Sequence, residues 1–158
     1  LPTDDTHLLV DDQGVFPIEL NDWERRVLET EKQQSGFLGW YRNPDRGVKE
    51  SLAVAYEDSG TWKALRPDFL FFSEVDGEVV VDLVDPHGFH LADALPKLRG
   101  LAKFAETHGH EFRRVEAVAL VGDRLRVLDL TRPVVREEVQ RSANARALYE
   151  SSYASDYQ

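Results

Sequence analysis

The segment from residue 68 to residue 84 constrains the fold most, because it predicts a β-hairpin with an apolar second arm. Residues 68–72 form the first arm, Asp76-Gly77 the turn, and residues 78–84 the second arm. The second arm contains the run Val-Val-Val-Asp-Leu-Val, which lacks the polar alternation of a strand with one wet face. This arm is therefore expected to be a central strand covered on both faces.

Other elements are predicted on both sides of this hairpin. Asn21 followed by Glu24 is a capping-box pattern that predicts a helix fading by Gly36. The remaining expectations are a short strand at 15–18, strands at 37–41 and 52–56, a helix at 92–107, strands at 115–121 and 125–130, a last helix from Pro133 to about Tyr149, and a loose tail from Ser151. This order predicts an α/β sandwich with a mixed β-sheet flanked by helices.

Three residues refine the expected helix at 92–107. Pro96 is tolerated only in its first turn, and Gly100 predicts close packing against another element. Gly109 is a plausible C-cap. The three tryptophans, Trp23, Trp40 and Trp62, are expected to pack in the core or an interface and not to stack on bases.

The length of 158 residues fits a single domain, with a core expected at about residues 15–150. No stretch is long and apolar enough for a membrane span, and no signal peptide is visible. Cysteine is absent, which excludes thiol chemistry and fits a cytoplasmic location. Methionine is absent even at position 1, so we interpret the chain as a fragment of a longer protein.

The net charge of −10 argues against a free-standing, sequence-independent DNA-binding protein. The charge is uneven, since residues 96–114 carry five lysines and arginines against two acids. This stretch predicts either a locally positive surface or simply a solvated helix face.

Candidate chemistry lies at the ends of the 68–84 hairpin. Asp68 opens one arm and Asp85 follows the other, and paired strands lie about 4.8 Å apart. Asp85 and His87 are two residues apart, which places them on one face of an extended strand. A carboxylate from each strand suits a hard cation such as Mg²⁺ (or Mn²⁺) that engages a phosphate.

These residues resemble a known family. Pro67-Asp68-Phe69 followed by Asp85-Pro86-His87-Gly88 resembles the PD-(D/E)XK nuclease motif. The chain is most similar to the C-terminal nuclease-like domain of helicase proteins related to type III restriction enzymes, with further support from residues 40–44, 62–69, 82–88 and 93–105. The resemblance covers roughly residues 15–135. It implies a restriction-endonuclease-like sandwich, DNA as substrate, and a helicase/ATPase part of the same polypeptide as partner.

The chain departs from this family where His87 replaces the lysine that follows the second carboxylate. The resemblance implies Asp68 and Asp85 as metal ligands, with His87 and Lys97 acting on water or phosphate. Lys97 would supply a migrated ammonium, and Glu24 matches an additional acid on the first helix. Asp82 is either a further ligand or a buried, paired acid. Each residue also has a purely structural interpretation: Asp68 and Asp85 as turn residues, Glu24 as a capping residue, and His87 and Lys97 as ordinary histidine and surface lysine.

Three functional hypotheses remain open. The first is a Mg²⁺-dependent DNA endonuclease domain of a helicase-linked restriction or phage-defence protein. The second is a degenerate nuclease fold that binds DNA or docks a partner without cutting. The third is an acidic protein-binding or inhibitory domain. No phosphate-binding loop is present, so any ATP use belongs to another part of the protein, and a homo-oligomer is compatible with all three.

Overall fold

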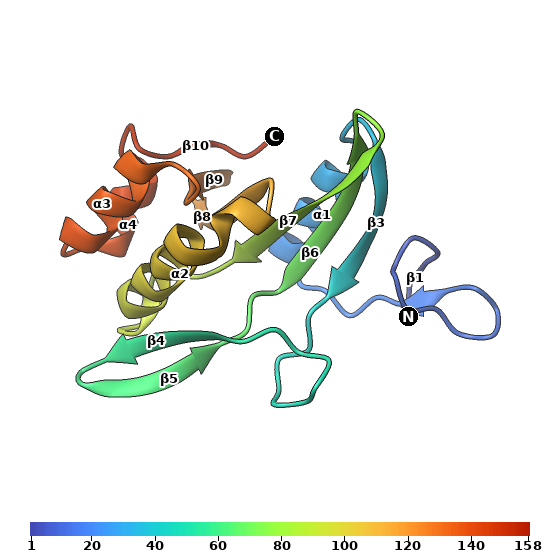
Figure 1. Cartoon of the computed structure of the whole chain (residues 1–158), viewed down its shortest axis with the longest axis horizontal. Coiled ribbons are helices and arrows are strands. Elements are labelled where there is room, and N and C mark those ends of the chain that lie inside the picture. The colour runs from blue at the N-terminus through green and yellow to red at the C-terminus, as the bar shows by residue number, and fades with distance from the viewer.

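The architecture is mixed α/β, with one six-stranded sheet flanked by helices (Figure 1). A computed structural model describes residues 1–158. The elements are β1 (Thr3–Asp4), β2 (Phe16–Pro17), α1 (Asp22–Lys32), β3 (Phe37–Arg42), β4 (Val54–Asp58), β5 (Thr61–Leu65), β6 (Phe69–Val75), β7 (Glu78–Pro86), α2 (Ala94–His108), the short 3-10 helix η1 (Gly109–Glu111), β8 (Arg114–Val121), β9 (Arg124–Asp129), α3 (Pro133–Arg141), α4 (Ala145–Glu150) and β10 (Ser155–Asp156).

The strand order of the main sheet is β10-β9-β8-β7-β6-β3. Neighbouring strands are antiparallel except β7 and β8, which are parallel and joined by α2. The β6–β7 hairpin turns at Asp76 and Gly77, both with positive φ, as a two-residue turn of this kind requires. The expected mixed sheet with β7 in its interior is confirmed.

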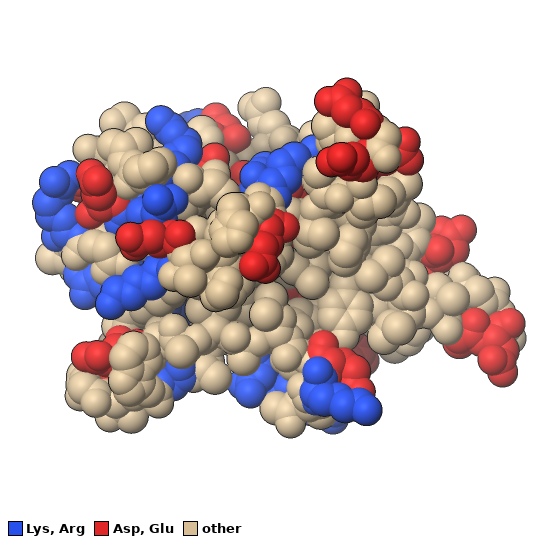
Figure 2. Space-filling view, viewed as in Figure 1, with Lys and Arg blue, Asp and Glu red and all other residues tan.

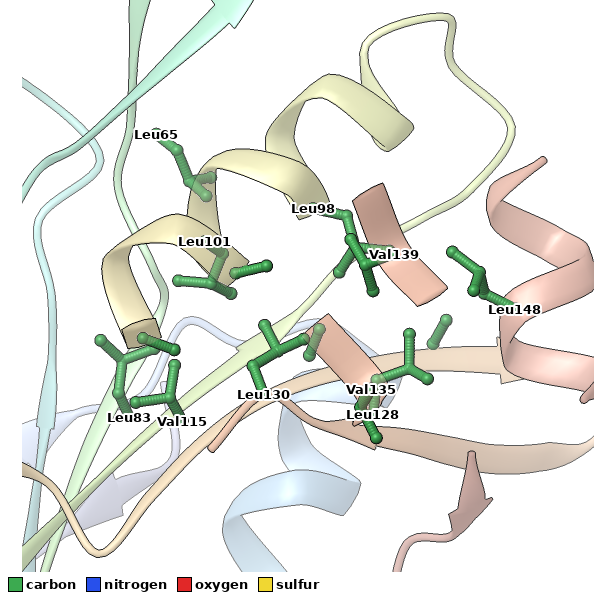
Figure 3. Close-up of a cluster of buried hydrophobic side chains, with 14 of the residues drawn as sticks. Leu65, Leu83, Leu98, Leu101, Val115, Leu128, Leu130, Val135, Val139 and Leu148 are labelled. Carbon is green, nitrogen blue, oxygen red and sulfur yellow. The ribbon is translucent and has the colours of Figure 1, made fainter. Parts of the chain in front are cut away.

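Both faces of the sheet are covered, as the apolar second arm of the hairpin predicted. Helix α1 packs Val27 and Leu28 against one face, together with Trp40, Phe69 and Val84. Helices α2, α3 and α4 cover the other face, and Figure 3 shows their side chains meeting those of β7, β8 and β9. Adjacent β7 residues therefore point into different cores, which fixes the direction of every functional side chain on this strand.

The predicted features of α1 and α2 are present. Asn21 caps α1 in a complete capping box with Glu24. Pro96 lies in the first turn of α2, and Gly109 is its C-cap. Gly100 packs directly on Tyr56 of β4, where an added Cβ would overlap the Tyr56 side chain. This close approach holds the β4–β5 hairpin, hereafter the arm, against α2.

Three elements of secondary structure differ from the sequence-based expectation. Strand β5 was not expected, although a turn with positive φ at Ser59 and Gly60 folds it back on β4. The last helix is two helices, because Asn144 starts α4 by accepting a hydrogen bond from the backbone N–H of Ala147 at 3.0 Å. The tail is not loose: β10 pairs with β9, and Asp156 forms an ion pair with Arg124. No helix is both long and apolar enough to span a membrane.

Candidate functional site

The site is centred on Asp68 and Asp85, which the β6–β7 hairpin brings together. Phe69 pairs with Val84 in the antiparallel register, so Asp68 lies opposite Asp85 at the paired ends of the two strands. The backbone N–H of Asp68 donates to Oδ1 of Asp85 at 3.1 Å. The structure thus places the two carboxylates of the predicted pair at one end of one hairpin.

Asp85 is almost fully enclosed, with 3% of its surface exposed. Its Oδ2 lies 3.5 Å from Nδ1 of His87, on the same face of the strand as expected. Both residues open onto a slot that also includes Lys97 and Tyr149, has mainly apolar walls, and has room for about one water molecule. Asp85 therefore points to the α2 side of the sheet, where it lines this small slot.

Glu24 adds a third acid from α1. Its Oε1 accepts the backbone N–H of Asn21 at 3.0 Å, completing the helix cap. Its Oε2 lies 2.7 Å from Nη1 of Arg42. The capping interpretation of Glu24 is therefore confirmed, and its other carboxylate oxygen is paired with Arg42, so its role as an additional acid of the site stays a prediction.

Arg42 is a site residue that the sequence analysis missed. Besides Glu24, its guanidinium reaches Oδ1 of Asp68 at 3.4 Å and lies 5.2 Å above the ring of Phe69. The backbone N–H of Arg42 donates to Nε2 of buried His7 at 2.9 Å. The usable signal was the pairing of strand 37–41 with strand 68–72, which brings the end of β3 beside Asp68.

The acids outnumber the cations that contact them. Burial, followed by the charge of Asp85, raises the pKa of Asp68 from 3.8 to about 8, although Arg42 opposes the shift. Burial also raises the pKa of Asp85 to about 7, against the hydrogen bond from Asp68 and the charges of Lys97 and Arg42. The protein therefore holds two carboxyl groups that are difficult to ionise together at neutral pH.

The two predicted basic residues lie in the slot beside Asp85. Lys97 pairs with Asp93, the N-cap residue of α2, with 3.1 Å between Nζ and Oδ2. Burial, followed by the charge of Lys97, lowers the pKa of His87 below 6.5. His87 is therefore neutral at pH 7, so it can accept a proton but supplies no fixed positive charge.

Asp82 is not brought to the site. It points to the α1 face, where it pairs with Arg113 and, at 2.7 Å, with Arg114. These guanidiniums hold the pKa of Asp82 below its usual value despite burial. Arg114 also binds Glu31 at 2.9 Å. Asp82 therefore fits the paired-acid alternative.

The carboxylate oxygens of Asp68 and Asp85 are the type of ligand that hard divalent cations such as Mg²⁺ and Mn²⁺ prefer. No three acidic or histidine side chains converge on one point that could hold an ion. Asp68 and Asp85 are the two that would hold a cation, with water completing its coordination. Mg²⁺ usually keeps several waters and takes one or two carboxylates, so two protein ligands fit it.

Comparisons with known proteins place the chain in a family. A model of the YagJ family matches residues 5–158. The chain belongs to the YagJ family. It is 52% identical to Protein YagJ of Escherichia coli (strain K12) over 158 residues, which is all of this chain and 65% of that relative. No solved structure matches. The family match carries no statement about nucleases or helicases, so that resemblance stays a prediction.

Proposed function

We propose that this chain is a divalent-metal-dependent DNA endonuclease domain that hydrolyses phosphodiester bonds. The observation that carries the proposal is the placement of Asp68 opposite Asp85, with Glu24 and Arg42 beside them. Two carboxyl groups with raised pKa values, close together and short of positive charge, are typical of functional sites. A bound dication would relieve this repulsion.

The topology is consistent with a restriction-endonuclease-like sandwich. Helix α1 precedes the antiparallel strands β3, β6 and β7, and α2 crosses over to the parallel strand β8. The acids come from α1, from the start of β6 and from the end of β7, as the PD-(D/E)XK resemblance implies. Lys97 on α2 lines the slot next to Asp85, which supports it as the migrated lysine.

The roles of the residues follow from their positions. A cation held by Asp68 and Asp85 would lower the pKa of a bound water and polarise the phosphate. His87 is neutral and adjacent to Asp85, so it would take a proton from the attacking water. Lys97 and Arg42 would face the phosphate oxygens, where their positive charges stabilise the transition state.

We further propose that this chain is one domain of a larger polypeptide. The chain spans 65% of its curated relative, and its net charge of −10 disfavours strong DNA binding by this domain alone. We propose that a helicase or translocase part of the same polypeptide supplies DNA affinity, in a restriction or phage-defence protein of the cytoplasm. The domain would then cut DNA delivered to it.

Cleavage of supercoiled plasmid tests this function. With 5–10 mM Mg²⁺ or Mn²⁺, a typical working range for such cations, we expect nicking by the wild type that EDTA abolishes. Asp85→Asn keeps the acceptor for the Asp68 N–H but removes the charge, so it should reduce nicking at least ~100-fold. Asp12→Asn, on an exposed acid whose side chain makes no hydrogen bond, is the matched control. Equal nicking by wild type and Asp85→Asn would refute the proposal.

A second candidate is a catalytically degenerate nuclease fold that binds DNA or docks a partner. Two observations favour it: His87 stands where PD-(D/E)XK nucleases have lysine, and Arg42 already contacts Glu24 and Asp68. In that case the guanidinium is a permanent substitute for the cation. The wild type would then bind DNA equally in EDTA and in Mg²⁺ and cut in neither.

A further inference from the structure

Trp62 is the most exposed of the phenylalanine, tyrosine and tryptophan side chains, with 66% of its surface accessible. It lies on β5 of the arm, which projects beneath α2 in Figure 1. The sequence analysis expected Trp62 to pack in the core or an interface and not to stack on bases, and this exposure excludes the core position. A tryptophan ring supplies a large, flat apolar surface, so an exposed one is available to stack on a ligand.

A groove of about 210 Å³ runs between the arm and α2, and Trp62 is part of its lining. Tyr56 and Gly100 form its floor, and their close contact keeps the arm from shifting relative to α2. The arm that carries Trp62 is therefore fixed in position relative to α2. Little conformational entropy remains to be lost when a ligand binds there.

The opposite wall of the groove is polar and basic. Arg99 and Lys103 of α2 and Gln140 of α3 line it, against one acid, Glu57. Lys103 is exposed and makes no ion pair. Nη2 of Arg99 donates to the backbone carbonyl of Ser142 at 2.6 Å, whereas its Nε is buried without a hydrogen-bond partner. Figure 2 shows lysines and arginines interspersed with acids over α3 and α4, whereas the β1–β2 end and the β6–β7 tip are mainly acidic. The lining of the groove therefore carries two cations, Arg99 and Lys103, against one acid.

We propose that this groove binds single-stranded DNA, with a base stacked on Trp62 and the neighbouring phosphates on Lys103 and Arg99. An aromatic face beside backbone-tracking cations is the arrangement that binds single strands without reading sequence. Duplex DNA keeps its bases stacked on each other and cannot offer one to Trp62. The groove binds one strand of an opened duplex.

The groove lies within reach of the acids. Trp62 is six residues before Asp68, and an extended chain rises about 3.3 Å per residue, so the two lie at most about 20 Å apart. A single strand seated in the groove would reach Asp68 and Asp85 within a few nucleotides. Delivery of the strand to Asp68 and Asp85 rests on the proposed nuclease function, whereas binding of the strand in the groove does not.

The test is the affinity of fluorescently labelled oligo-dT of 12 nucleotides, measured by anisotropy in EDTA with the Asp68→Asn protein so that cleavage plays no part. Trp62→Ala should weaken binding about tenfold, the loss typical of one stacked base, and Trp62→Phe should recover most of it. Lys103→Ala should weaken binding and reduce its salt dependence. Arg25→Ala, on an exposed arginine of α1 across the sheet, should leave both unchanged.

Three results would overturn the groove assignment: no binding by the parent protein, equal binding by Trp62→Ala, or a duplex of the same length binding as tightly as the single strand. Failure of the nuclease proposal looks different, since plasmid nicking would be absent while oligo-dT still binds through Trp62. Loss of oligo-dT binding with metal-dependent nicking intact would remove the groove alone.

Discussion

The substitution Asp68→Asn should stabilise the metal-free protein at alkaline pH. The pKa of Asp68 rises from 3.8 to about 8 on folding, first because the group is buried and then because Asp85 is charged. An acid with a raised folded pKa costs no stability below its unfolded pKa. The cost grows as pH rises from about 4 to about 8 and is constant above that. Asparagine keeps the shape and removes the charge.

The size of the effect follows from the shift. Four pKa units correspond to about 5–6 kcal/mol at 1.36 kcal/mol per unit. The side chain of Asp68 is 21% exposed, so water screens part of this cost, and we expect a gain on the order of 2 kcal/mol at pH 8. For a domain of this size that is a rise in melting temperature of roughly 4–8 °C. At pH 4.5 the gain should nearly vanish.

The assay is thermal unfolding in EDTA at pH 4.5 and pH 8, with Asp12→Asn as control. Saturating Mn²⁺ should reverse the order, because a ligand at 100 times its Kd stabilises by about 2.7 kcal/mol and Asp68→Asn would lose this gain. The reasoning is refuted if Asp68→Asn melts below the wild type at pH 8 in EDTA.

Three further substitutions test other parts of the account. Arg42→Met removes the guanidinium that contacts Glu24 and Asp68, so it should tighten Mn²⁺ binding about tenfold while lowering nicking; unchanged calorimetric affinity would argue against competition between the two cations. His87→Ala should lower the nicking rate at pH 7 by about 100-fold, because it removes the group that takes a proton from the attacking water, and an unchanged rate would remove His87 from the mechanism. Gly100→Ala should lower unfolding stability by about 1–3 kcal/mol in urea because its Cβ meets Tyr56, whereas Gly109→Ala, which meets nothing, should stay within about 0.5 kcal/mol.

The sequence predicted those elements whose signals are local. The Asn21–Glu24 cap, the Asp76-Gly77 turn and the first-turn Pro96 each act within a few residues, and the structure contains all three. The apolar run at residues 78–84 correctly indicated a strand, β7, between two layers of helices. Side-chain alternation along β7 then separates Asp85, toward α2, from Asp82, toward α1.

The misses depend on contacts between distant parts of the chain. Strand β5 is exposed along most of its length and has no apolar run to mark it. The tail is held by Arg124 and by Tyr157, whose hydroxyl donates to Glu31 at 2.5 Å, and neither contact can be seen in a window of local sequence. Arg42 was overlooked for the same reason, because only the pairing of β3 with β6 brings it beside Asp68.

The most direct test of the central claim is the binding of Mn²⁺, measured by calorimetry and by the electron paramagnetic resonance signal of free Mn²⁺. The account predicts one ion per chain at pH 8, lost in Asp68→Asn and in Asp85→Asn and kept in Asp12→Asn. Uptake that is absent from the wild type, or that survives both substitutions, would contradict a cation held between the two strand ends.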